Sequence, residues 1–109
     1  MKKATKEDFL RNKENKIKAQ VSNGDQLYVQ AYNFLYNYYS LKSLSSGSPV
    51  LLVFEAIYVK KLILPAWKLA NHCNVSRTSL FNYRNEIVNN FNTCLTKSFS
   101  ISEIAFTKG

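Results

Sequence analysis

The sequence has few of the residues that build metal centres, disulfide frameworks and hydrolytic sites. It contains one histidine, His72, and two cysteines, Cys73 and Cys94, among 109 residues. Two cysteines are too few for a disulfide framework, and these two show no metal-ligand spacing. No serine, cysteine or tyrosine has an activating base at a recognisable spacing. We therefore expect a protein that is not an enzyme and that binds no metal and no cofactor.

Acidic residues are also scarce. Seven Asp and Glu stand against fifteen Lys and Arg, which gives a formal net charge of +8 and a pI near 9.6. Such an excess attracts polyanions, and its first use would be sequence-independent contact with phosphates. A generic basic protein of one domain remains the alternative at this length.

Long hydrophobic runs are missing as well. The longest apolar stretch, residues 50–59, already contains Glu55 and is followed by Lys60 and Lys61. A membrane-spanning helix needs about 20 apolar residues. The chain starts Met-Lys-Lys and continues with charged residues, unlike a signal peptide. We expect a cytoplasmic protein with no membrane partner.

Residues 66–91 carry the pattern of a helix-turn-helix. Ala70 is small where two crossing helices would come closest, and Asn74 stands at the turn, where the backbone needs a positive φ. Ser76 offers a side-chain oxygen to cap the second helix, which is expected from about Arg77. Apolar residues occupy the positions where the two helices must touch. These are Leu69, Cys73, Val75, Leu80 and Tyr83.

The region before this motif divides into two parts. Residues 1–23 are charge-dense and predict a basic arm or a weakly held helix. In one interpretation its lysines follow a DNA backbone; in the other it is a solvated tail. The lysines concerned are Lys2, Lys3, Lys13, Lys16 and Lys18.

Residues 24–42 predict a helix with more aromatic area than one buried face requires. Asn23, Gly24 and Asp25 form a helix breaker and cap before it. One interpretation is a core helix whose tyrosine hydroxyls reach solvent; the other is a homodimer interface. The interface would comprise Leu27, Tyr28, Tyr32, Phe34, Leu35 and Tyr39.

The remaining elements suggest a small β component. Residues 50–60 should form the central buried helix, with a strand as the second option. Residues 62–64 fit a short strand stopped by Pro65. Residues 93–108 are expected to form a hairpin: a strand, a turn at 97–98 and a second strand. The short strand at 62–64 would pair with this hairpin. The expected fold class is mainly α with a small β-hairpin (α+β): a winged helix-turn-helix over 24–109 with an extra N-terminal helix.

Three short motifs carry a resemblance to a known class. Leu69-Ala70, Val75-Ser76-Arg77-Thr78-Ser79-Leu80 and Tyr83-Arg84 resemble the pattern Leu-Ala, Val-Ser-Arg-Ser-Thr-Leu, Tyr-Arg of bacterial winged helix-turn-helix DNA-binding proteins. Residues 95–109 resemble the DNA-binding segments of Mga-type regulators. Size and layout are similar to those of small plasmid-encoded winged-helix accessory proteins. The resemblance implies double-stranded DNA as the partner.

The second motif helix supplies the candidate base contacts. With Leu80, Tyr83 and Ile87 facing the core, Thr78, Asn82 and Asn85 lie on the opposite face. Asn suits adenine, Arg suits guanine and a Thr methyl suits thymine, so the residues favour an A·T-leaning site. The alternative is that these asparagines are ordinary surface. Trp67 is expected to pack. The candidate DNA contacts are Lys68, Ser76, Arg77, Thr78, Ser79, Asn82, Arg84 and Asn85, with Lys97 and Ser98 at the hairpin tip.

Three functions fit these expectations. The first is transcription regulation by sequence-specific DNA binding. The second is an accessory role in plasmid conjugation or partition, at a transfer origin or partition site, where a protein partner could join a nucleoprotein complex. The third is a winged-helix protein-interaction module, against which the polar face of the second motif helix argues.

Overall fold

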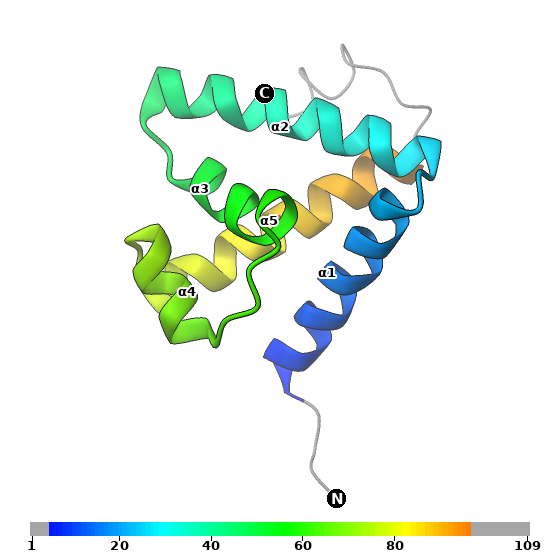
Figure 1. The fold of residues 1–109 in the computed structure, drawn as a ribbon. Helices are drawn as coiled ribbons and strands as arrows, with labels where there is room; N and C mark the ends of the chain where they lie inside the picture. Colours follow the sequence, from blue (N-terminus) through cyan, green and yellow to red (C-terminus); the bar gives the residue numbers. More distant parts are fainter. Residues whose placement is uncertain (1–4, 97–109) are drawn as a thin grey trace, which may run out of the picture.

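The computed structural model describes residues 5–96, and every regular element in that range is a helix (Figure 1). The helix α2 lies across one side of the molecule, α5 passes beneath it, and α1 and α4 flank α5. A single π-helical turn, η1, continues α3. The elements are α1 (Lys6–Ser22), α2 (Gln26–Ser46), α3 (Val50–Phe54), η1 (Glu55–Val59), α4 (Ala66–Cys73) and α5 (Arg77–Thr96). None of the helices in residues 5–96 is long and apolar enough to span a bilayer.

The expectation of a mixed fold with a β-hairpin wing is wrong for the described residues. Residues 93–96, expected to begin the hairpin, form the last turn of α5. Phe91 and Cys94 explain this, because both are buried at helical spacing and continue the inner face of α5. The rest of the expected wing, residues 97–108, lies outside the described residues.

The short strand expected at residues 62–64 is also absent. This segment is an extended connection between η1 and α4, and no strand pairs with it within residues 5–96. Leu62 and Leu64 are half-buried while Ile63 is 86% exposed, so the alternation that resembles a strand belongs to a loop lying on the core. A hydrogen bond fixes the start of this segment, because the Leu62 amide donates to Ala56 O at 2.9 Å.

The N-terminal region is a well-formed helix rather than a loose arm. Thr5 and Asp8 form a capping box, in which the Asp8 amide donates to Thr5 Oγ1 at 3.1 Å and the Thr5 amide donates to Asp8 Oδ2 at 3.0 Å. Leu10 and Ile17 are buried against the other helices. Ionic contacts, described below, also bind α1 to the other helices, so few buried apolar residues suffice to hold it.

The centre of the core is aromatic. Phe54 lies between rings from three elements, with centroids 5.6 Å from Tyr39, 5.3 Å from Tyr58 and 6.3 Å from Phe91. All four residues are buried. The prediction of a central buried helix over residues 50–60 is confirmed in place, and its second half takes the wider π-helical turn.

The helix expected at residues 24–42 is present as α2, and Asp25 caps it through bonds from the amides of Leu27 and Tyr28. Two residues assigned to a dimer interface, Leu35 and Tyr39, are buried within the monomer and are unavailable to a partner. Tyr28, Tyr32 and Phe34 are half-buried and pack against the core, whereas Leu27 is 55% exposed. Most of the surplus aromatic area of α2 therefore serves the core.

Candidate nucleic-acid interface

The turn between α4 and α5 has the geometry that the sequence predicts. Asn74 adopts φ 58° and ψ 45°, the left-handed conformation that ends α4. The Val75 amide then donates to Ala70 O at 3.0 Å and closes the turn. Ser76 Oγ accepts from the Ser79 amide at 3.0 Å, which caps the start of α5. A three-residue turn with both ends capped fixes the direction in which α5 leaves α4.

The packing between α4 and α5 fixes their mutual position. Leu69, Ala70 and Cys73 from α4 are buried, as is Leu80 from the first turns of α5. Val75 is half-buried beside them. Because the buried side chain of Ala70 is small, the two helices can approach closely, and Arg77, Thr78 and Asn82 near the start of α5 remain exposed.

The start of α5 carries four of the ten predicted contact residues. Arg77, Thr78 and Asn82 are exposed, and Ser79 is half-buried. Ser76 is exposed at the turn, although its hydroxyl oxygen is engaged in the cap. These residues make up the polar surface of the turn and of the first two turns of α5.

Lys68 lies on the neighbouring helix, near the start of α4. Its ammonium group lies 5.4 Å from the ring centroid of Trp67, a cation–π contact at the surface. Trp67, expected to pack, is 51% exposed, so its ring lies at the surface against Lys68 and not in the core. Together the two residues form an exposed cationic and aromatic corner of α4.

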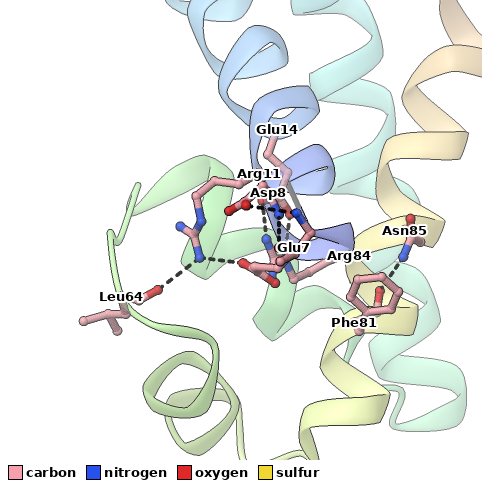
Figure 2. Close-up of polar contacts among 9 residues, drawn as sticks. Glu7, Asp8, Arg11, Glu14, Leu64, Phe81, Arg84 and Asn85 are labelled. Atoms are coloured by element: carbon pink, nitrogen blue, oxygen red, sulfur yellow. Dashed lines mark hydrogen bonds and ion pairs between the residues drawn. The ribbon is translucent and has the colours of Figure 1, made fainter. Parts of the chain in front are cut away.

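Arg84 does not belong to the DNA-facing surface. It is only 1% exposed and points toward α1 (Figure 2). Its Nε and Nη2 each donate to Glu14 at 2.8 Å, a bidentate pair, and Nη1 donates to Glu7 Oε1 at 2.7 Å. The prediction that Arg84 lies along a DNA backbone is therefore wrong: this guanidinium joins α5 to α1.

The same network reaches the segment before α4. Arg11 Nη2 donates to Glu7 Oε2 at 2.8 Å and to Leu64 O at 3.3 Å (Figure 2). Burial raises the pKa of the Glu7 carboxyl, but hydrogen bonds and attraction from Arg84 and Arg11 outweigh it, and the pKa lies below its ordinary value. Burial lowers the pKa of Arg84, but hydrogen bonds and attraction from Glu14 and Glu7 outweigh burial, and the pKa lies above its ordinary value. Both shifts favour the charged forms of Glu7 and Arg84, whose ion pair joins α1 to α5.

Sequence reasoning missed this network, although a local signal was present. Glu7, Leu10, Glu14 and Ile17 recur at three- and four-residue spacing, which places two acids on the buried face of α1. Acids on an inward face require a cationic partner. Nothing local identifies Arg84 as that partner, because it lies 70 residues from Glu14.

Asn85 is less available than predicted. It is half-buried, and its Nδ2 donates to Phe81 O at 3.1 Å within the same helix (Figure 2). Residues of α1, among them Lys6 and Lys13, share a hollow of about 300 Å³ with Asn85 and Phe81. Asn85 thus lies at the border between α5 and α1. Lys97 and Ser98, predicted as wing contacts, lie outside the described residues.

The cysteines and the histidine are separated by burial. Cys73 and Cys94 are buried free thiols, and burial raises the pKa of Cys94 to about 11. His72 is exposed on α4. Within residues 5–96, no three His, Cys, Asp or Glu side chains are grouped so that they could hold a metal ion.

Comparison of the chain with models of known protein families, with curated proteins and with solved structures finds no match. The function is therefore inferred from the geometry of this molecule.

Proposed function

We propose that this protein is a non-enzymatic, sequence-specific binder of double-stranded DNA that regulates transcription in the cytoplasm. The observation that carries the proposal is the exposed polar face at the start of α5. Arg77, Thr78 and Asn82 lie there, on the second helix of a capped helix-turn-helix whose inner face is fully packed. In such motifs the start of the second helix enters the major groove.

Each of these side chains suits a different base edge. A guanidinium such as that of Arg77 can donate two bonds to O6 and N7 of guanine, and the amide of Asn82 can pair with N6 and N7 of adenine. The methyl group of Thr78 can pack against that of thymine. Lys68 on α4 and the backbone around Ser76 and Ser79 would contact phosphates, which fix the position of the protein without reading sequence.

Regulation would follow from occupancy. A bound protein of this size at an operator blocks or recruits polymerase, and the proposal requires no bound effector. We also place a self-contact on the exposed part of α2, at Leu27 and Leu41, which are 55% and 67% exposed. A dimer through this surface would present two copies of α5 to successive turns of the duplex, about 34 Å apart.

The test is selection of bound duplexes from a random pool, followed by titration of the winning site against scrambled DNA. We expect enrichment of about 10³-fold or more over scrambled DNA. Arg77→Ala with Asn82→Ala should then relax the sequence preference, since each bidentate base contact discriminates by about 1 to 3 kcal/mol. The matched control is Lys60→Ala with Asn33→Ala, which removes one cation and one amide from exposed positions outside α5.

Two results would refute the proposal. The first is an unenriched pool. The second is an unchanged sequence preference in the Arg77 and Asn82 variant, which would remove α5 from base recognition.

A further inference from the structure

The helix α1 presents a row of lysines beside the candidate reading helix. Lys6 and Lys13 line the hollow of about 300 Å³ that Phe81 and Asn85 of α5 close from the other side. Lys13 and Lys16 line a second hollow of about 170 Å³ farther along, opposite Asn92. The three lysines therefore follow the groove between α1 and α5 over three turns of α1.

These lysines are free to meet an external partner. All three are exposed, and none forms an ion pair or a side-chain hydrogen bond within residues 5–96. Their spacing of seven and three residues places them on one flank of the helix. By the same helical geometry Lys18 falls on another flank, where it is half-buried.

The acids of α1 do not oppose this row. Glu7 and Glu14 fall on the other flank, where Arg84 and Arg11 neutralise them. Asp8 turns to the helix start, where it accepts from the Thr5 amide. The flank of α1 that carries Lys6, Lys13 and Lys16 therefore holds no acid, whereas Glu7 borders a separate hollow with Arg77 and Thr78 at the start of α5.

We propose that Lys6, Lys13 and Lys16 form a second DNA-contacting element, which binds the phosphates of one strand at the edge of the groove that α5 enters. This inference rests on the proposed function and extends its surface from α4 and α5 onto α1. A rise of 1.5 Å per residue separates Lys6 from Lys16 by about 15 Å along α1. One DNA strand presents a phosphate every 3.4 Å along the axis, so this length spans about four phosphates. The Arg84 network holds the row in a fixed register relative to α5.

The test measures the salt dependence of binding. The variant Lys6→Gln, Lys13→Gln, Lys16→Gln is titrated with the selected duplex between about 50 and 200 mM salt. Each lost phosphate contact lowers the slope of log K against log salt by about 0.9, so we expect a decrease of about 2 to 3. Glutamine is a good helix former, and these exposed lysines form no ion pair or side-chain hydrogen bond in the described chain, so the thermal melt should be unchanged.

The matched control removes the same charge elsewhere. Lys42→Gln, Lys60→Gln, Lys61→Gln changes lysines on α2 and in the segment after η1, and its slope should stay within about 0.5 of the unchanged protein. Equal slopes for the two variants would overturn the proposal, because charge alone would then account for the loss.

The ratio of specific to scrambled affinity separates this proposal from the preceding one. If α5 reads bases and α1 contacts phosphates, the lysine variant weakens both affinities and keeps their ratio. If the protein shows no site preference but the lysine variant still lowers the slope of log K against log salt, base reading by α5 is refuted. The α1 contact then remains as a non-specific phosphate contact.

Crosslinking gives an independent readout. The two native thiols are buried, so Lys13→Cys can be labelled selectively with a photoactivatable group. We expect crosslinks to the backbone of the selected duplex from residue 13 and none from a label at Lys60→Cys. Failure of the residue 13 label to crosslink while the protein is bound would place α1 away from the DNA.

Discussion

The buried pair of Glu14 and Arg84 allows the sharpest test of how α1 is held. Both side chains are almost completely buried, at 4% and 1% exposure, and their two bonds are each 2.8 Å. Glu14→Gln keeps the shape of the side chain and removes its charge. Arg84 then keeps only Glu7 as a charged partner, and that carboxylate is one-third exposed.

Breaking a buried pair by removing one partner costs about 3 to 5 kcal/mol. Since Glu7 still accepts from Arg84 Nη1, and the glutamine oxygen still accepts one bond, we expect the lower end, about 3 kcal/mol. Domains of this size have about 5 to 15 kcal/mol of stability, so the variant should still fold. With a urea m-value of about 1.5 kcal/mol/M, the midpoint should fall by about 2 M.

The assay is urea unfolding followed by circular dichroism, with Glu14→Leu, Arg84→Met as the companion variant. Removing both charges leaves no uncompensated ion, so the double variant should recover most of the lost stability. A loss below about 1 kcal/mol in Glu14→Gln would refute the reasoning that the pair is buried and coupled. A double variant no more stable than Glu14→Gln would refute the reasoning that an unpaired charge is the cause.

Three further predictions concern other sites. Tyr58→Phe should stabilise the protein by about 1 kcal/mol, because the buried Tyr58 hydroxyl has no hydrogen-bond partner within residues 5–96. Tyr39→Phe should destabilise it, because it loses the 2.7 Å hydrogen bond from Asn90. Equal urea midpoints for the two variants would contradict both expectations. Folding lowers the pKa of the Glu7 carboxyl, so the stability that Glu7 contributes is present above pH 4.5, its ordinary pKa, and is lost as the pH falls below that value. Glu7→Gln should therefore flatten the dependence of stability on pH between about 5 and 3. An unchanged profile would exclude Glu7 as the source of this dependence. Leu27→Asp with Leu41→Asp should give a monomer in sedimentation, and a wild-type mass would remove α2 from any self-contact.

The sequence predicts the local features of the molecule well. The left-handed turn at Asn74 and the cap at Ser76 follow from residue chemistry over four or five positions, and both are confirmed. The buried positions Leu80 and Ile87 follow from helical periodicity and are also confirmed. These features need no knowledge of distant partners.

The errors arise where distant residues decide. Residues 93–96 contain threonines that suit a strand, but Cys94 extends the inner face of α5, so the helix continues to Thr96. Arg84 resembles a surface contact until α1 supplies Glu7 and Glu14. Secondary-structure propensity and residue spacing do not predict such pairings, and in each case a tertiary contact overrides the local preference.

The distribution of acids argues against the idea that the positive charge is incidental. Each acid within residues 5–96 has a structural role. Glu7 and Glu14 bind Arg84, while Asp8 and Asp25 cap helices. The other two also have partners, since Glu55 accepts from the Tyr36 hydroxyl at 3.2 Å and Glu86 lies 3.9 Å from Lys42.

The lysines of α1 show the opposite behaviour, because Lys6, Lys13 and Lys16 are exposed and have no acidic partner in the described chain. Exposed lysines that served only solubility would be expected among acids of opposite sign on the same surface. Here the described acids are held in helix caps, ion pairs and hydrogen bonds, while the three cations lie along α5 beside Phe81, Asn85 and Asn92. The excess charge therefore follows the helix whose start would enter a major groove.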